Sequence, residues 1–257
     1  MKFGVCMGLD EIEEVAKAGF DYLEPAVVSA LKPEDPAADV LPVLQAHSGL
    51  PALAFNLFLP ADLKIVGETI DRPRLEHYVQ EAFRRASLAG ARVIVLGSGG
   101  ARRIPDGFPR FEAERQLSEC LKLCAAASER FGVRLAIEAL NLRECNFVNS
   151  VAEAAEFARR CGSPSVGVVS DLYHILMDSQ TFEETLEAHD VLMHVHVSSA
   201  TERQAPQDGD LALLTKYFQV LKRAGYDGLI SVEAQWRSVA EQGAAARAVL
   251  EEAWASA

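Results

Sequence analysis

One pattern repeats along the whole sequence: a short apolar run, a loop, an amphipathic helical segment and then another apolar run. Eight of these runs are rich in Val, Ile and Leu, as strands buried on both faces should be. The expected strands are residues 2–6, 22–24, 52–56, 93–96, 135–138, 166–171, 192–197 and 229–233. Strictly alternating strands and helices require a parallel sheet with right-handed crossovers, which is either open or closed into a barrel.

The segments between the expected strands carry apolar residues at helical spacing. Between residues 75 and 86 they recur at i, i+3, i+4, i+7 and i+8, and a similar stripe begins at Leu214. Asp10 with Glu13 resembles a capping box at the start of the first helix. Several stripes are followed by a glycine just before the next strand, where a left-handed residue ends a helix. These glycines are Gly19, Gly90, Gly132, Gly162 and Gly225.

Eight strand–helix units in 257 residues favour a single α/β domain over residues 1–257, folded as a (β/α)8 TIM barrel. An open, doubly wound sheet is the alternative. The loop after the first expected strand lacks the GxGxxG pattern that is typical of dinucleotide-binding sheets of that kind, which favours the barrel.

The net charge indicates which kinds of binding partner are disfavoured, and the cysteine content indicates the cellular compartment. With 37 acidic and 25 basic residues the formal net charge is −12, which disfavours nucleic acids and anionic membranes as partners. The first residues contain no apolar stretch of signal-peptide length, and no run approaches 18 apolar residues. The five cysteines form no CxxC pair, as expected of reduced thiols. We therefore expect a cytoplasmic protein with a small-molecule partner.

Polar residues stand at the carboxyl ends of the last four expected strands. They are Glu138, Asp171, His196 and Glu233, separated by 33, 25 and 37 residues. In a TIM barrel these strand ends meet at the face that carries the active site. A single acid at such a position is most often a helix cap or the partner of an arginine, but four in succession indicate a common site.

Three carboxylates in one small volume repel each other unless a cation joins them. Three carboxylates with one imidazole suit one divalent ion, Mn²⁺ as the first choice, with Mg²⁺ or Co²⁺ as alternatives. Zn²⁺ also accepts this ligand set. The strand ends therefore predict a metal site.

Several segments resemble a known family. They are IEALNLRECNFVNS (137–150), SDLYH (170–174), HVHVSS (194–199), SVEAQW (231–236) and VIVLGSGGARRIPDGF (93–108). In this order they are similar to motifs of the sugar phosphate isomerase/epimerase superfamily of xylose isomerase-like TIM barrels. That superfamily includes ketose 3-epimerases and hydroxypyruvate isomerases.

The resemblance implies that Glu138, Asp171, His196 and Glu233 bind the metal, and that Glu138 and Glu233 are the catalytic acid–base pair. It also implies that the substrate hydroxyls are bound by a further set of residues. Glu144 and His174 form this set, and Arg203 is implied as a substrate-contacting arginine, although it lies one residue later than the arginine of the family. Leu142 and Ala234 replace a usual arginine and a usual proline, and these departures leave the substrate open.

The implied reaction is the isomerisation or epimerisation of a small sugar, ketose or sugar phosphate. A carbon-bound proton next to a carbonyl would be removed through a metal-stabilised enediolate, with Glu138 and Glu233 exchanging protons with the substrate. Dehydration of an inosose-like or dehydroshikimate-like substrate on the same barrel is the alternative. An endonuclease IV-like phosphodiesterase and a non-catalytic sugar-binding barrel are disfavoured, the first because few further histidines lie near the expected site. A homo-oligomer is compatible with this family.

Further polar residues near the same face have two interpretations each. Glu24 and Asn56 end strands and either line the pocket or cap a helix, and His194 is either a core histidine or a support for the metal ligands. Trp236 is expected at the pocket wall.

The glycine-rich segment 97–100, with Arg102 and Arg103 after it, is expected to be a mobile loop. A phosphate-binding loop is the alternative, because backbone amides and arginines bind anions.

Overall fold

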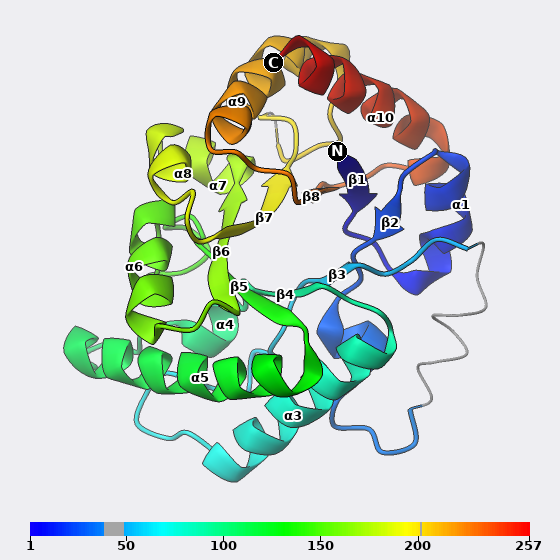
Figure 1. Cartoon of the computed structure of the whole chain (residues 1–257). Helices are drawn as coiled ribbons and strands as arrows, with labels where there is room; N and C mark the ends of the chain where they lie inside the picture. Colours follow the sequence, from blue (N-terminus) through cyan, green and yellow to red (C-terminus); the bar gives the residue numbers. More distant parts are fainter. Residues whose placement is uncertain (39–48, 201) are drawn as a thin grey trace.

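The computed structural model describes residues 1–38, 49–200 and 202–257. Eight parallel strands form one sheet in the order β2-β1-β8-β7-β6-β5-β4-β3. Isolated parallel bridges between Leu23 and Ala52 and between Ala26 and Asn56 connect the two end strands, so that the sheet closes on itself. Figure 1 shows the resulting ring of strands with the helices around it. The predicted TIM barrel is confirmed.

The strands lie close to the predicted positions. Their bounds are β1 Lys2–Val5, β2 Tyr22–Leu23, β3 Ala54–Phe55, β4 Val93–Leu96, β5 Arg134–Glu138, β6 Val166–Asp171, β7 Leu192–Val197 and β8 Leu229–Val232. β2 and β3 are shorter than expected. Pro25, two residues after β2, and Pro51, three residues before β3, have no N–H to donate to a ladder, and pairing in this region continues only as the isolated bridges.

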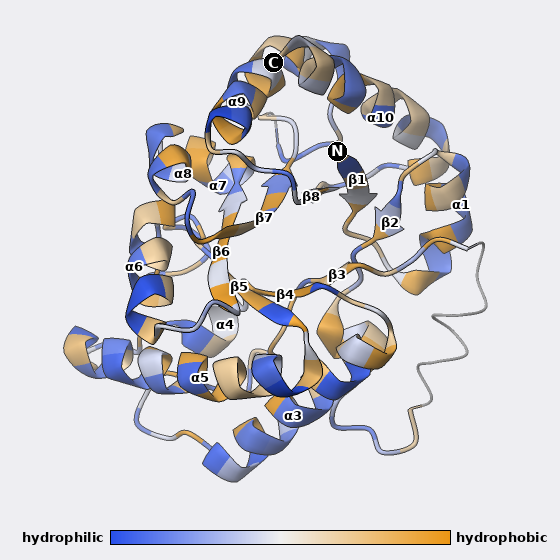
Figure 2. Ribbon diagram, viewed as in Figure 1, coloured by the Kyte–Doolittle hydropathy of each residue, from blue (hydrophilic) through white to orange (hydrophobic). Residues whose placement is uncertain are grey.

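Helices cover the outside of the barrel. Their bounds are α1 Ile12–Lys17, α3 Arg72–Leu88, α4 Gly99–Arg102, α5 Arg110–Phe131, α6 Val151–Cys161, α7 Leu172–Met177, α8 Glu183–Glu187, α9 Leu211–Arg223 and α10 Val239–Ser256. Shorter helical turns span Leu9–Glu11, Val27–Leu31 and Asp208–Asp210. Hydrophilic and hydrophobic residues alternate along the helical ribbons in Figure 2, as they do in helices with one buried face.

The helix ends confirm one expectation and contradict another. Gly132 and Gly162 end α5 and α6 in the left-handed conformation, with φ of 72° at both residues. The expected capping box of Asp10 and Glu13 is wrong. A 3₁₀ turn over Leu9–Glu11 precedes α1, so that Glu11 occupies the cap position and makes no side-chain capping hydrogen bond.

The core has two parts that follow the alternation of side chains along the strands. Ile94 and Leu96 of β4 pack in the larger cluster between the strands and the helices, whereas Val93 and Val95 belong to a smaller cluster formed by strand residues inside the barrel. On β7 the pairing with β6 shifts register, because Val168 pairs with Leu192 and Val169 with His194. This bulge sets which residues of β7 face the interior.

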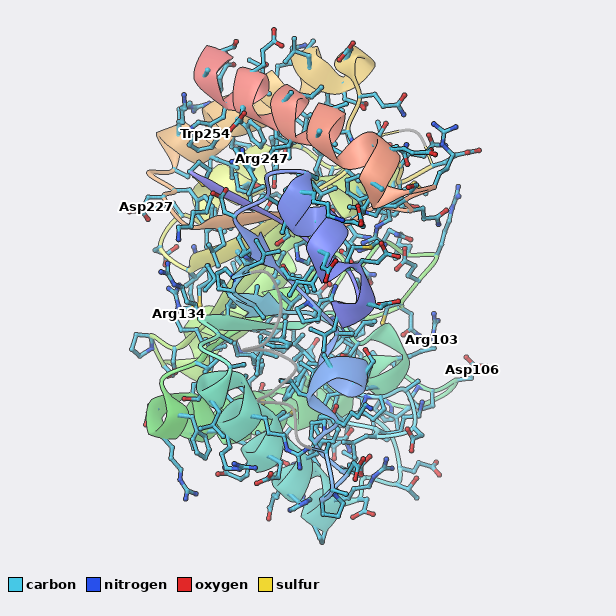
Figure 3. The ribbon with its side chains drawn as sticks, turned by 90° about the vertical axis from the view of Figure 1, so that its right-hand side faces the viewer. Arg103, Asp106, Arg134, Asp227, Arg247 and Trp254 are labelled. Atoms are coloured by element: carbon cyan, nitrogen blue, oxygen red, sulfur yellow. The ribbon has the colours of Figure 1, made fainter. Side chains whose placement is uncertain are left out.

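The two ends of the barrel are distinct in the side view of Figure 3. Arg134, at the start of β5, and Asp227, just before β8, lie at one end, whereas Arg103 and Asp106 lie at the other, in the loop region that follows β4. The second end is the face at which the strands terminate. Among the described residues, none of the helices is long and apolar enough to cross a membrane.

Candidate active site

The structure brings together the four polar residues at the predicted strand ends. One ligand atom from each of Glu138, Asp171, His196 and Glu233 lies within 4.8 Å of the others. Nδ1 of His196 is at the centre of the group, 3.0 Å from Oε1 of Glu138 and 2.9 Å from Oε2 of Glu233. Oδ2 of Asp171 is 4.0 Å from the same nitrogen. Three of the four side chains are buried, and that of Glu233 is 24% exposed.

This spacing and this donor set fit a divalent cation. Bonds of about 2.1 Å to a metal place neighbouring ligand atoms about 3 Å apart and opposite ones about 4 Å apart. The distances around Nδ1 of His196 fall at these two values. Carboxylate oxygens with one imidazole nitrogen are ligands for Mn²⁺, Mg²⁺, Co²⁺ or Zn²⁺.

Arg203 faces the same carboxylates from the loop after β7. Its Nη2 lies 2.6 Å from Oε2 of Glu233 and 3.3 Å from Oδ2 of Asp171. Nη1 is 3.7 Å from Oε1 of Glu144, and the guanidinium stacks 4.7 Å from the centroid of the Tyr173 ring. The backbone of Arg203 is left-handed, with φ of 53°. This guanidinium therefore neutralises part of the negative charge of the carboxylate group.

The pKa values of the two glutamates shift in opposite directions. Burial and the negative charge of Glu233 raise the pKa of Glu138. Burial also acts to raise the pKa of Glu233, but His196 and Arg203 outweigh it and lower this pKa to about 2. Two carboxylates with opposite protonation preferences in one site are suited to general acid–base chemistry.

A pocket of about 180 Å³ opens above these residues. Residues at or after the ends of β3, β4, β5, β6, β7 and β8 contribute to its wall. Arg203 is the only lysine or arginine among the residues that line it in the described part of the chain. The lining residues are Asn56, Leu57, Gly97, Ser98, Gly99, Glu138, Leu140, Glu144, His174, Arg203 and Glu233. All three residues that the resemblance assigns to the substrate, Glu144, His174 and Arg203, are in this list.

His174 presents a hydrogen-bond donor to the site. The backbone N–H of Asn141 donates to its Nδ1 at 3.2 Å, so that Nδ1 is the acceptor and the ring proton resides on Nε2. Nε2 is buried, 3.6 Å from Oδ2 of Asp171, and makes no hydrogen bond. The side-chain amide of Asn141 lies 2.8 Å from Nδ1 of His174 and donates at 2.8 Å to Oε1 of Glu144. Asn141 thus orients both residues.

Sequence reasoning did not single out Asn141 or Leu57, and it considered Ser98 only as part of the glycine-rich segment 97–100. Asn141 stands inside a quoted motif, in the sequence LNL, and this was the available signal. Leu57 and Ser98 line the pocket in left-handed conformations, with φ of 42° and 25°. Strained backbone of this kind is concentrated at functional sites. The left-handed conformation of Leu57 could not be predicted from the sequence, because leucine rarely adopts it.

The glycine-rich segment lines the pocket, and its second half begins a helix where a loop was expected. Gly97 and Ser98 line the pocket, and Gly99 begins α4. Arg102 is fully buried and donates to the carbonyl oxygens of Leu96 at 2.8 Å and Glu138 at 2.6 Å. Its guanidinium is occupied by the ends of β4 and β5, and so it is unavailable to a phosphate.

Of the three remaining candidates for the pocket wall, only one lines the pocket. Glu24 is fully buried and contacts His194 and His196, so that its role is neither pocket lining nor helix capping. Asn56 lines the pocket, as one of its two interpretations expected. Trp236 is not among the residues that line the pocket in the described part of the chain; it packs edge-on against Phe20, with ring centroids 6.4 Å apart.

Comparison with curated proteins identifies relatives over most of the chain. A Streptomyces coelicolor protein that is provisionally named a hydroxypyruvate isomerase is 28% identical over 242 residues, which cover 88% of this chain and 84% of that protein. The 2-oxo-tetronate isomerase of Haemophilus influenzae is 25% identical over 241 residues, which cover 91% of this chain and 90% of that protein.

Solved structures share the fold at lower identity. D-Allulose 3-epimerase from Methylomonas sp. superposes with a TM-score of 0.83 at 19% identity, covering 98% of this chain and 96% of that one. 3-Keto-D-glucoside 4-epimerase from E. coli gives a TM-score of 0.81 at 20% identity, covering 98% and 99%. The IOLI protein, solved with a bound zinc atom, gives 0.69 at 18% identity, covering 98% and 96%.

Apart from the IOLI protein, these relatives are isomerases and epimerases in name, which confirms the expectation of an enzyme of that class. The sequence profile of the xylose isomerase-like TIM barrels matches residues 12–254. Because this match spans nearly the whole chain, the protein belongs to the xylose isomerase-like TIM-barrel family.

Proposed function

We propose that the protein is a metal-dependent isomerase or epimerase that moves a proton next to the carbonyl of a small ketose. The pair Glu138 and Glu233 carries the proposal, because both line one pocket and share one group of ligand atoms with Asp171 and His196. The names of the relatives support the same class of reaction.

The two glutamates are placed to exchange protons with a bound substrate. Oε1 of Glu138 faces His196, whereas Oε2 points toward Gly97 on the pocket wall, where it is available to a carbon-bound proton. β6 and β7 separate β5 from β8, so that Glu233 approaches from a different side of the pocket. One carboxylate can therefore remove a proton and the other return it on the opposite face, which favours epimerisation.

A divalent ion held by Glu138, Asp171, His196 and Glu233 would supply Lewis acidity toward the carbonyl and the adjacent hydroxyl oxygen. The chain itself orients the sugar. Nε2–H of His174 donates to a substrate oxygen, and the carboxylate of Glu144, which is 42% exposed at the rim, accepts from a hydroxyl.

The charges and the size of the pocket favour a small substrate without a phosphate or carboxylate. Four carboxylates, those of Glu138, Glu144, Asp171 and Glu233, stand against one guanidinium, so that a divalent ion still leaves the site negative. Residues 39–48 and Thr201 contain no lysine or arginine either. The volume of about 180 Å³ is below the range of drug-sized pockets, which begins at about 300 Å³.

The test is turnover of a panel of ketoses, their phosphates and small 2-keto acids in deuterated water with Mn²⁺. We expect one neutral ketose to be converted with incorporation of deuterium at one carbon. Glu138→Gln and Glu233→Gln should each lower kcat at least 100-fold, because each removes a proton acceptor. If both variants kept more than a tenth of the activity, the scheme would be wrong. An unsaturated product absorbing in the ultraviolet would instead identify a dehydratase.

A further inference from the structure

A buried carboxylate lies below the candidate metal ligands and takes no part in the reaction proposed above. Glu24, just after β2, is 0% exposed and is surrounded by donors. Its Oε1 lies 3.0 Å from Nε2 of His196, and its Oε2 lies 2.7 Å from Nε2 of His194. Ser231 donates its hydroxyl to Oε2 at 2.5 Å. A buried carboxylate with three partners is a built feature of the fold, because an unpaired one would be costly.

The contact with Glu24 determines which nitrogen of His196 carries the proton. An ionised carboxylate only accepts hydrogen bonds, so that Nε2 of His196 must be the donor. In the neutral form that a metal ligand requires, the ring then has its lone pair on Nδ1, which faces Glu138 and Glu233 at 3.0 Å and 2.9 Å. Nδ1 is the nitrogen that a metal ion in this group would use.

The other partners of Glu24 fix its own position. The hydroxyl of Tyr22 lies 2.7 Å from Oγ of Ser231, so that Ser231 is held on its far side as well. His194 is two residues before His196 on β7, and both rings point to Glu24. The carboxylate therefore joins β2, β7 and β8 beneath the site.

We propose that Glu24 is a positioning residue that holds His196 with its Nδ1 lone pair directed at the metal. This inference rests on the metal site of the proposed function, but it concerns a residue outside the ligand group. Carboxylates that accept the second N–H of a ligand histidine fix the orientation of the ring and strengthen metal binding by about 10- to 100-fold.

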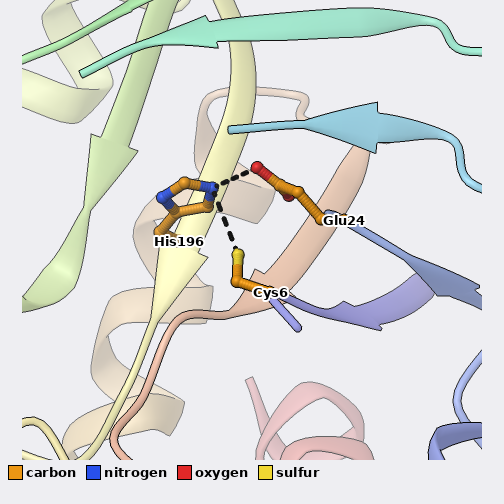
Figure 4. A group of neighbouring side chains, drawn as sticks. All are labelled: Cys6, Glu24 and His196. Carbon is orange, nitrogen blue, oxygen red and sulfur yellow. Dashed lines mark hydrogen bonds and ion pairs between the residues drawn. The ribbon is translucent and has the colours of Figure 1, made fainter. Parts of the chain in front are cut away.

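Cys6 is a second possible hydrogen-bond acceptor for Nε2 of His196. Figure 4 shows Cys6 and Glu24 both pointing at His196, with Sγ of Cys6 at 4.0 Å from Nε2. The carboxylate oxygen is a full ångström closer and is the stronger acceptor. Cys6 therefore supplies a matched control for a side chain that touches His196 without orienting it.

The experiment is a titration of the metal-free protein with Mn²⁺. Isothermal calorimetry measures the heat of binding, and electron paramagnetic resonance measures the concentration of free Mn²⁺. Glu24→Gln keeps the shape of the side chain but can no longer accept from every partner, and we expect its Mn²⁺ affinity to fall about 10- to 100-fold. Cys6→Ala should stay within about twofold of the parent, and Asp171→Asn should lose binding.

Three outcomes would overturn the inference. A folded Glu24→Gln that binds Mn²⁺ as tightly as the parent would show that Glu24 does not position His196, while Asp171→Asn would still support the metal site. Two ions per parent chain with one lost in Cys6→Ala would make Cys6, Glu24 and His196 a second metal site. A parent that binds no ion would overturn the inference together with the metal dependence of the proposed function.

A measurement on the parent alone covers the case in which Glu24→Gln does not fold. Nitrogen-15 labelling of the histidines in the Zn²⁺-loaded protein reports which ring nitrogen is protonated. We expect the proton of His196 on Nε2, coupled to a ring whose Nδ1 is metal-bound. A proton on Nδ1 of His196, or none on either nitrogen, would contradict the positioning role.

Discussion

At the scale of the residue, the absence of a side chain at Gly97 is what allows Glu138 its position. A Cβ added to Gly97 would overlap Oε2 of Glu138 and lie 3.4 Å from its carboxyl carbon. The carboxylate therefore occupies the space that any other residue at position 97 would fill. The glycine that sequence analysis assigned to a mobile loop is therefore required for the observed position of the Glu138 carboxylate.

Gly97→Ala should consequently impair the site. We expect kcat to fall at least tenfold and Mn²⁺ binding to weaken, because Glu138 must move, with a loss of about 1–3 kcal/mol in the free energy of unfolding from overpacking. Turnover, metal titration and urea unfolding measure these effects. Gly209→Ala is the matched control, because its added Cβ meets nothing within 4 Å. Equal activity in the two variants would refute the close approach.

At the scale of the element, Arg102 connects the ends of two strands and the loop beyond them. Besides the carbonyl oxygens of Leu96 and Glu138, it donates to that of Phe147 at 3.2 Å. These three carbonyls lie at the ends of β4 and β5 and in the segment before α6, where strand pairing no longer supplies donors. The buried guanidinium therefore donates the hydrogen bonds that a neighbouring strand would otherwise donate, and it fixes the backbone of Glu138.

Arg102→Met should destabilise the protein strongly. Methionine fills similar space but leaves buried carbonyls without a donor, which costs about 1–3 kcal/mol for each group. We expect the free energy of unfolding to fall by more than about 3 kcal/mol in denaturant titrations. Arg103→Met, at the neighbouring exposed position, removes one bond to the backbone oxygen of Glu144 and should cost less than about 1 kcal/mol. Similar losses in both variants would contradict this role.

The elements also show why the sequence predicted some features and not others. Glu138, Asp171, His196 and Glu233 could be found because each interrupts or ends an apolar run at a strand end, and topology alone brings such ends together. Arg102 and Gly97 could not be assigned, because exposure and close approach depend on the packing of distant segments. Asn141 acts through its backbone N–H and its amide on His174, a contact across 33 residues that no local pattern encodes. The metal-binding and catalytic roles themselves remain predictions.

At the scale of the whole molecule, the group of carboxylates at one end of the barrel predicts that a bound divalent cation adds to the stability of the folded chain. A ligand that binds only the folded chain adds about 2.7 kcal/mol at a concentration 100 times its Kd. For a chain of this size we expect Mn²⁺ to raise Tm by about 5–10 °C at that concentration, as measured by scanning calorimetry. Chelation should reverse the shift, and Asp171→Asn should not show it. An unchanged Tm in the parent would count against the site.

Arg203 affects whether the chain can fold before it binds a metal ion. Its guanidinium lies against Glu233 and Asp171, so that the repulsion among the acids is relieved by a group that the chain carries itself. Small zinc domains differ, because in them the metal drives folding. Because the chain carries this counter-charge, we expect it to fold after synthesis and to remain folded in the metal-free form. Its activity would then follow the supply of metal in the cell, whereas its abundance would not.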